Sequence, residues 1–193
     1  MLSRDRRLFF LRWLRNPHHV GVPIPSSRGL AKAVAAQLSA LSEGEYVVEL
    51  GPGTGVITHA ICANVKQKNL VLIDRDHQFI ERLKHDFPEA TVLEGDARHL
   101  KELLAQHNIT QVAAVVSSLP LLTMPDNICH AIVNSAFEVI KSDGVFIQYT
   151  YGPASPVTEK HQRSIGIKGK VAKRVWRNFP PARVWCYRVE SRV

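Results

Sequence analysis

Short apolar runs alternate with amphipathic segments through the middle of the chain. The runs are YVVEL at 46–50, LVLID at 70–74, TVLEG at 91–95, VAAVVSS at 112–118 and VFIQYTY at 145–151. Strands that alternate with helices build βαβ units, in which neighbouring strands run parallel. The sequence therefore predicts an α/β fold around a mostly parallel sheet.

The end of the chain leaves this alternation. Two strand-like runs, GKVAKRVWR at 169–177 and ARVWCYRVE at 182–190, are joined by the proline-rich segment NFPP. Two such runs separated by a short turn predict a β-hairpin. The sheet is therefore expected to end in a C-terminal antiparallel β-hairpin.

Helical spacing predicts segments that cover this sheet. Ser26 or Ser27 can cap a helix that runs to about Ser42, because apolar residues recur there at helical intervals. A later helix is predicted over 127–141, and Gly144 is expected to close it.

Residues 1–16 predict an amphipathic helix at the N-terminus. Its apolar arc contains Phe9, Phe10, Trp13 and Leu14, and five arginines lie within the first fifteen residues. Such a segment can lie in the headgroup region of a membrane while its arginines meet anionic lipid, each basic residue adding about 1 kcal/mol. The alternative is a helix that packs on the core with a solvated basic face.

The composition fits one globular domain with a basic surface. A chain of 193 residues holds a single α/β domain over 1–193, in which 45–193 would form the Rossmann-like core. The formal net charge is +8 and the isoelectric point about 9.7, so the surface should attract polyanions. Charge alone does not choose between nucleic acid and acidic lipid.

Cysteine usage and hydropathy point to the cytoplasm. Cys62, Cys129 and Cys186 are odd in number, widely spaced and set in apolar runs, which favours buried free thiols in a reducing compartment. No apolar run reaches the roughly eighteen residues of a membrane-spanning helix. The nine histidines show no zinc-like spacing, so no metal is expected.

The turn after the first strand is rich in glycine. It reads ELGPGTG at 49–55 and stands directly before a helical segment that begins near Val56. Glycines allow backbone angles and close approaches that a side chain forbids, and a helix N-terminus offers free N–H donors. Gly51, Gly53 and Gly55 therefore predict a site for a nucleotide-like ligand. A tight turn without a ligand is the alternative, since a glycine motif alone is a weak signal.

Acidic residues stand at the ends of three successive strands. These residues are Glu49, Asp74 and Asp96. Asp74 follows the glycine turn by about twenty residues, where an acid can accept hydrogen bonds from both ribose hydroxyls of an adenosine group. Because ligands of open α/β sheets bind at the carboxyl edge, the three acids strengthen the prediction of a ligand site there.

These spacings resemble those of class I, Rossmann-like methyltransferases, whose sheet also ends in an antiparallel hairpin. The resemblance implies S-adenosylmethionine as the cofactor and S-adenosylhomocysteine as the product. It places the methionine part on the glycine loop and the ribose on Asp74. It also implies that Asp96 accepts from the adenine amino group while the Ala97 backbone meets the ring. A dinucleotide dehydrogenase fits less well, because its glycines follow the spacing G-x-G-x-x-G.

The fourth strand leads into Ser118-Leu119-Pro120-Leu121. This segment resembles the tetrapeptide of amino-group methyltransferases, which implies that Ser118 lies where the cofactor meets the acceptor amine. That tetrapeptide normally closes with an aromatic residue, and Leu121 lacks the ring. A nucleic-acid base, which would stack on such a ring, is therefore disfavoured as the acceptor.

A narrower resemblance extends over almost the whole chain. LRWLRNP, PSSRGLA, VVELGPGTGVIT, SSLPLL, QYTYGPASPV and VWRNFPPARVW are similar to segments of the bacterial phospholipid N-methyltransferases. This resemblance implies methyl transfer from S-adenosylmethionine to the nitrogen of phosphatidylethanolamine, towards phosphatidylcholine. It also implies a peripheral enzyme at the inner face of the cytoplasmic membrane, with a phospholipid surface as its partner and no nucleic acid.

Three hydroxyl groups near the carboxyl edge are candidates for orienting the acceptor amine. They belong to Ser118, Tyr149 and Tyr151, and a nearby carbonyl oxygen is the alternative. A polar acceptor is needed because the substrate ammonium must lose a proton before it can attack. The tyrosines stand two residues apart in a strand and so share one face, where plain packing is their alternative role.

The lipid phosphate would need a cation. Candidates in the segments after the fifth strand are His161, Arg163 and Arg183. A solvated charge is the alternative role of each.

Two other functions stay open. An RNA adenine N6-dimethyltransferase would also use the glycine loop and the high isoelectric point, but Leu121 and the lack of a separate C-terminal helical domain count against it. A non-catalytic lipid- or nucleic-acid-binding module that kept the fold is the second. Calorimetry with S-adenosylmethionine identifies such a module, because it would give no heat of binding.

Overall fold

The computed structural model describes residues 28–176, 178 and 180–190. None of the helices in this part of the chain is both long and apolar enough to cross a membrane. The predicted helix over 1–16 lies outside the described residues, and so do its apolar side chains and the candidate caps of the next helix, namely Phe9, Phe10, Trp13, Leu14, Ser26 and Ser27.

Seven strands of the described residues form one sheet in the order β3-β2-β1-β4-β5-β7-β6. The strands are β1 Val47–Leu50, β2 Leu70–Asp74, β3 Thr91–Glu94, β4 Val112–Ser117, β5 Ile140–Thr150, β6 Ile167–Val175 and β7 Ala182–Val189. β1 to β5 run parallel, whereas β7 pairs antiparallel with both β5 and β6. The predicted Rossmann-like sheet with a C-terminal antiparallel hairpin is confirmed.

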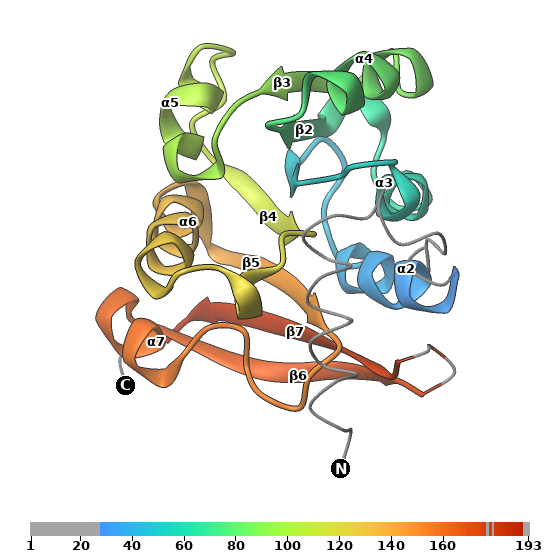
Figure 1. Ribbon diagram of the computed structural model, residues 1–193. Helices are drawn as coiled ribbons and strands as arrows, with labels where there is room; N and C mark the ends of the chain where they lie inside the picture. Colours follow the sequence, from blue (N-terminus) through green and yellow to red (C-terminus); the bar gives the residue numbers. More distant parts are fainter. Residues whose placement is uncertain (1–27, 177, 179, 191–193) are drawn as a thin grey trace.

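Helices cover both faces of this sheet (Figure 1). One face carries α2 Arg28–Ala35, α3 Val56–Ile61 and α4 His77–Asp86. The other carries α5 Leu100–Ala105, α6 Asp126–Val139 and α7 Glu159–Ile165. Short 3-10 turns are η1 Ala36–Leu38, η2 Gln67–Asn69, η3 Ala97–His99 and η4 Leu121–Thr123. Each face has its own apolar cluster, so β1 and β4 are buried along their whole length.

The prediction that Gly144 closes a helix is wrong. α6 ends at Val139, and Gly144 lies inside β5. A Cβ on Gly144 would lie 2.8 Å from the Ala113 carbonyl oxygen, beside a shift in the register of β4 and β5. Glycine therefore lets the two strands approach closely. The residues around Gly144 in the sequence do not predict this contact, because Ala113 is distant in the chain.

The helix predicted to reach Ser42 is shorter than expected. α2 ends at Ala35, and the chain continues as the 3-10 turn η1 to Leu38. Leu38 is 1% exposed and belongs to the apolar cluster on this face of the sheet. The tighter turn thus buries the last apolar residue of the segment before the chain leaves for β1.

The three cysteines are free thiols, as predicted. Cys129 and Cys186 are buried, whereas Cys62 is half-buried, which departs from the prediction. Burial raises the pKa of each thiol. They therefore stay protonated and pack as small apolar groups.

Gly169 lies against a buried aromatic ring in the hairpin. It pairs directly with Tyr187, and a Cβ at this position would lie 2.2 Å from the ring carbon Cε1. Tyr187 is fully buried, and its hydroxyl lies 2.8 Å from the Ser155 hydroxyl. The hydrogen bond and the surrounding core hold the ring in place, so there is no room for a side chain at Gly169.

Replacing Gly169 with alanine is expected to lower the free energy of unfolding by roughly 1–3 kcal/mol, as overpacking of a core does. Denaturant titration measures the change. Lys170→Ala is the matched control, because the exposed neighbour on the same strand should change stability by no more than about 0.5 kcal/mol. Equal losses at both positions would contradict the role assigned to the ring contact.

Candidate active site

The glycine turn, Asp74 and Ser118 meet at the carboxyl edge of the sheet. β1 lies between β2 and β4, so the turn that follows β1 lies between the ends of these two strands. The Gly51 N–H donates to the Ile73 carbonyl at 2.8 Å, and the Ser118 N–H donates to the Leu50 carbonyl at 2.9 Å. Backbone hydrogen bonds thus fix the three strand ends relative to one another.

The glycine turn is packed on one side and open on the other. Gly51, Gly53 and Gly55 have φ angles of +66°, +54° and +78°, which side chains disfavour. A Cβ on Gly51 would lie 2.6 Å from the Leu119 side chain, whereas no atom of the described residues lies within 4 Å of a Cβ built on Gly53. Among the described residues the turn is therefore open at Gly53, which is one of the glycines that the sequence predicts to bind the cofactor.

Asp74 supports the turn and keeps spare acceptor capacity. Its Oδ2 accepts from the Gly53 N–H at 3.1 Å, and its Oδ1 accepts from the Asp76 N–H at 3.0 Å. A carboxylate has about four lone-pair sites, so about two of them stay available to ribose hydroxyls. The structure therefore places Asp74 where the sequence predicts a ribose-binding acid.

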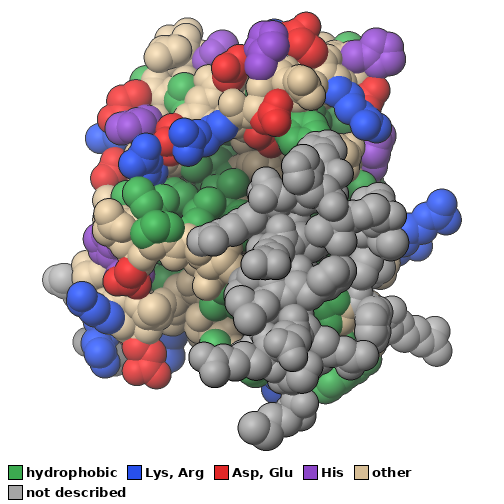
Figure 2. Space-filling view, viewed as in Figure 1, with side chains coloured by type: hydrophobic (Ala, Val, Ile, Leu, Met, Phe, Trp, Pro, Cys, Tyr) green, Lys and Arg blue, Asp and Glu red, His purple; other side chains and the backbone are tan. Residues whose placement is uncertain are grey.

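Asp96 follows the neighbouring strand β3 and is engaged by arginines. Arg98 contacts its carboxylate at 2.7 Å, and the Arg75 guanidinium lies 3.8 Å away. Hydrogen bonds from the Arg98 side chain lower the pKa of Asp96 to about 2. Asp96 also caps η3, and Ala97 is buried at the start of that turn. Charged and histidine side chains crowd this upper part of the molecule, around β3 and α4 (Figure 2).

Glu49 lies beneath the glycine turn rather than at its surface. It is fully buried, and its carboxylate accepts from the Thr58 hydroxyl at 2.7 Å and from the Ser118 hydroxyl at 3.2 Å. Burial raises the pKa of Glu49 to about 7, although the two hydrogen bonds act in the opposite direction. Of the three predicted acids, Asp74 and Asp96 are partly exposed at the edge, whereas Glu49 supports it from below.

A buried glutamine holds the segment that follows Ser118. Gln148 lies beside Ser117 of β4, and its Nε2 donates to the carbonyls of Leu119 at 3.0 Å and Tyr149 at 2.8 Å. Only the amide nitrogen carries protons, so these two acceptors fix the orientation of the amide. Sequence reasoning missed Gln148. A lone amide inside the apolar run VFIQYTY is the signal that points to it, because buried polar groups need partners.

Tyr149 and Tyr151 meet edge to face, with their ring centroids 6.0 Å apart. Both rings are half-buried and pack against the apolar cluster on the α2 and α3 face. They share one face, as the strand spacing predicts, and lie at the same edge of the sheet as Ser118. The structure thus shows a packing role for both tyrosines. Their predicted role in orienting the acceptor amine stays a prediction.

The buried side chain of His161 makes a polar contact between α7 and the more exposed Asp126 of α6. It is 4% exposed, its Nε2 lies 3.1 Å from the Asp126 carboxylate, and its ring meets the His130 ring at 4.8 Å. A carboxylate neighbour opposes the binding of an anion, so this position is poorly suited to a lipid phosphate. The described residues contain no cluster of three metal-ligating side chains, here or elsewhere.

The two predicted arginines lie in different surroundings. Arg163 is exposed on α7, where its guanidinium lies 3.9 Å from the Glu159 carboxylate, a surface pair of small energetic weight. Arg183 donates to the Pro153 carbonyl oxygen and pairs with Thr150 at the end of β5. Arg183 is therefore the candidate that the sheet itself places at the carboxyl edge.

Comparisons with known proteins identify the family of this chain. The methyltransferase domain family matches residues 47–144. The ornithine lipid N-methyltransferase of Singulisphaera acidiphila is 30% identical over 154 residues, which cover 78% of this chain and 80% of that protein. The chain belongs to the methyltransferase domain family. S-adenosylmethionine is its cofactor.

Two further comparisons place this methyltransferase among its relatives. A TehB-like methyltransferase from Corynebacterium glutamicum has the same fold, with a TM-score of 0.61, 18% identity, and coverage of 96% of this chain and 98% of that one. Ribosomal RNA small subunit methyltransferase A of Dechloromonas aromatica is 46% identical over 68 residues, which cover 33% of this chain and 26% of that protein. The similarity to the RNA enzyme is thus confined to part of the chain.

Replacing Gln148 with leucine in this methyltransferase is expected to lower kcat by about tenfold or more while binding of S-adenosylmethionine stays within about threefold. The reason is that the Leu119 carbonyl loses its buried donor, so the segment after Ser118 shifts, whereas the glycine turn keeps its own hydrogen bonds. Steady-state kinetics and calorimetry measure the two quantities. Equal losses of kcat and cofactor affinity would contradict the interpretation that Gln148 affects the segment after Ser118 and not the cofactor site.

Proposed function

We propose that this methyltransferase transfers methyl groups to the amine of a membrane lipid, with phosphatidylethanolamine as the acceptor and phosphatidylcholine as the final product. The similarity to an ornithine lipid N-methyltransferase across 78% of the chain is the observation that carries the proposal. Both kinds of lipid carry a primary amine, so the same site chemistry serves either of them. Ornithine lipid is therefore the second acceptor to test.

The carboxyl edge offers the groups that such a transfer needs. S-adenosylmethionine supplies a methyl group already activated on a sulfonium, so the chain has to place the amine, receive its proton and exclude water. Gly53, Asp74 and Asp96 would hold the cofactor. Ser118 lies beside them and donates to Glu49 at 3.2 Å.

Proton removal from the substrate ammonium is assigned to this hydroxyl and the carboxylate behind it. A carboxylate whose pKa is about 7 can receive a proton near neutral pH, and the Ser118 hydroxyl can pass one to it. Tyr149 and Tyr151 lie at the same edge and are the side chains proposed to orient the nitrogen. Arg183 is the proposed partner of the lipid phosphate.

A peripheral position on the inner face of the cytoplasmic membrane is part of the proposal. The net charge of +8 favours attraction to anionic lipid, and the amphipathic helix that the sequence predicts over residues 1–16 would support the same placement. No nucleic-acid partner and no metal ion is proposed for the reaction.

RNA adenine methylation is the second candidate, because ribosomal RNA methyltransferases share 46% identity with part of this chain. Two observations disfavour it. These matches cover between 28% and 49% of the chain, and Leu121 stands where a stacking aromatic residue is expected.

Methyl transfer from labelled S-adenosylmethionine tests these acceptors directly. Vesicles containing phosphatidylethanolamine, vesicles containing ornithine lipid, and ribosomal RNA are incubated in parallel, and the products are identified by mass spectrometry. Methylated phosphatidylethanolamine is the expected product. Label found in ornithine lipid alone would mean that ornithine lipid, and not phosphatidylethanolamine, is the acceptor. Label found in RNA alone would overturn the assignment of a lipid acceptor.

A further inference from the structure

The turn of the β6–β7 hairpin lies at the same edge of the sheet as the cofactor residues. Thr150 at the end of β5 pairs with Arg183 near the start of β7, and Val175 at the end of β6 pairs with Ala182. β6 therefore ends on the side where β4 and β5 end, and Figure 1 shows the hairpin reaching out on that side. The hairpin thus extends the carboxyl edge beyond the cofactor site.

A shallow pocket of about 160 Å³ lies where the hairpin meets the chain that leaves β5. Its lining includes Tyr151 and Gly152 from that connection and Arg174, Trp176 and Arg183 from the hairpin. Arg174 and Arg183 are directly opposite each other in the register of β6 and β7. The pocket therefore brings two guanidinium groups beside one of the tyrosines proposed to orient the amine.

Exposed apolar side chains gather at the same place. The large hydrophobic side chains that are exposed in the described residues are Trp176 at 69%, Val189 at 49% and Leu122 at 46%. Leu122 lies next to Gly152, since a Cβ built there would be 3.2 Å from Leu122 Cδ1. Two of these three side chains thus flank the pocket, whereas Val189 lies at the far end of β7.

The charge around the pocket is positive. Arg174 is exposed, and neither it nor Arg183 forms an ion pair with an acidic side chain of the described residues. The Pro153 carbonyl occupies part of the Arg183 guanidinium, and the remaining N–H groups of a guanidinium can bind a phosphate. Cations beside protruding apolar side chains match the boundary between lipid phosphates and acyl chains.

We propose that this surface, formed by Leu122, Gly152, Arg174, Trp176 and Arg183 and called the hairpin surface, docks on an anionic phospholipid membrane. Trp176 and Leu122 enter the headgroup region, and the two arginines bind lipid phosphates. Docking in this way turns the carboxyl edge toward the membrane, so a lipid amine reaches Ser118 without leaving the bilayer surface. The inference deepens the proposed function and rests on it for the identity of the membrane as partner.

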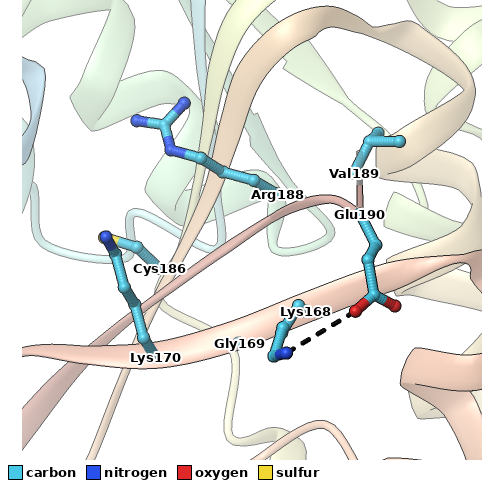
Figure 3. A pocket seen from close by; sticks show the side chains of 7 residues that line it. All are labelled: Lys168, Gly169, Lys170, Cys186, Arg188, Val189 and Glu190. Atoms are coloured by element: carbon cyan, nitrogen blue, oxygen red, sulfur yellow. Dashed lines mark ion pairs between the residues drawn. The ribbon is translucent and has the colours of Figure 1, made fainter. Parts of the chain in front are cut away.

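A basic pocket at the other end of the hairpin provides the control. It has a volume of about 400 Å³ and is lined by Lys168, Lys170 and Arg188, with Glu190 3.6 Å from Lys168 (Figure 3). Lys168 pairs with Arg188 near the start of β6, at the edge away from the cofactor. Lys170→Glu and Arg174→Glu reverse one charge each on the same strand, so they change the net charge of the protein equally.

Sedimentation of the full chain with vesicles of phosphatidylglycerol and phosphatidylcholine tests the proposal. These vesicles contain no amine acceptor, so the measurement does not depend on methyl transfer. Arg174→Glu and Trp176→Ala are each expected to weaken the partition coefficient by about tenfold or more, while Lys170→Glu changes it by less than about threefold. Unchanged melting temperatures establish that the variants are folded.

Three outcomes would overturn the hairpin surface. One is an equal loss from Lys170→Glu and Arg174→Glu, which would mean diffuse attraction of charge. Another is unchanged vesicle binding by Trp176→Ala. The third is that Arg174→Glu and Trp176→Ala lose binding to RNA while their binding to vesicles stays intact. Failure of the proposed function is distinguishable, because it would appear as wild-type protein that binds these vesicles yet leaves phosphatidylethanolamine unmethylated.

Discussion

Replacing Asp74 with alanine is expected to weaken binding of S-adenosylmethionine by at least about 100-fold. A hydrogen bond to a charged group contributes about 1.5–3 kcal/mol, and the carboxylate has room for two from the ribose hydroxyls. The substitution also removes the acceptor of the Gly53 N–H, which holds the glycine turn. Isothermal titration calorimetry on the free protein measures the affinity.

Asp76→Ala is the matched control for this experiment. Asp76 lies two residues away and caps α4 by accepting from the Gln78 N–H, so its loss should lower stability by about 1 kcal/mol and leave cofactor affinity nearly unchanged. Asp74→Ala protein that is folded and still binds within about threefold of wild type would contradict the ribose assignment.

Replacing Glu49 with glutamine is expected to change how stability depends on pH in the protein without cofactor. The pKa of Glu49 is raised from 4.5 to about 7 because the carboxyl is buried. A raised carboxyl pKa means that the folded state holds a proton that the unfolded state has already lost between pH 4.5 and 7. The stabilising contribution of Glu49 is therefore complete below pH 4.5 and is lost as pH rises to about 7.

The size of the Glu49 effect follows from the shift. At 1.36 kcal/mol per pH unit, the wild-type protein loses about 3 kcal/mol over this window through Glu49 alone. Glutamine has nearly the same shape and does not ionise, so the variant should not show this loss. Between pH 4.5 and 7, the stability of Glu49→Gln relative to the wild-type protein should therefore rise by about 3 kcal/mol. Urea titrations of both proteins at several pH values measure the difference. If the difference in free energy of unfolding between the two proteins stayed constant from pH 4.5 to 7, the pKa of Glu49 would not be raised.

Local patterns were sufficient to predict the sheet and the meeting of its strand ends at one edge. The apolar runs of β1, β2 and β4 and the glycine turn are specified by residues adjacent in the chain, and parallel topology brings the ends of those strands together. Asp74 at the end of β2 therefore follows from the sequence. The burial of Glu49 does not, because it depends on Thr58 and Ser118 closing over its carboxylate.

Contacts between distant residues account for the features that the sequence did not reveal. α7 has seven residues, too few for a stable isolated helix, and His161 within it bonds to Asp126, 35 positions away. The local signals for this helix are Thr158, which caps its start, and Gly166, which ends it. Gln148 likewise gains its role from a carbonyl 29 positions away.

The order of the strands has a consequence for protein synthesis. β7 follows β6 in the chain but lies between β5 and β6 in the sheet, so β6 cannot be incorporated until β7 has left the ribosome. Until then β5 presents an unpaired, largely apolar border on the nascent chain. A ribosome that pauses before Ala182 would thus carry a partly folded intermediate open to aggregation or chaperone binding.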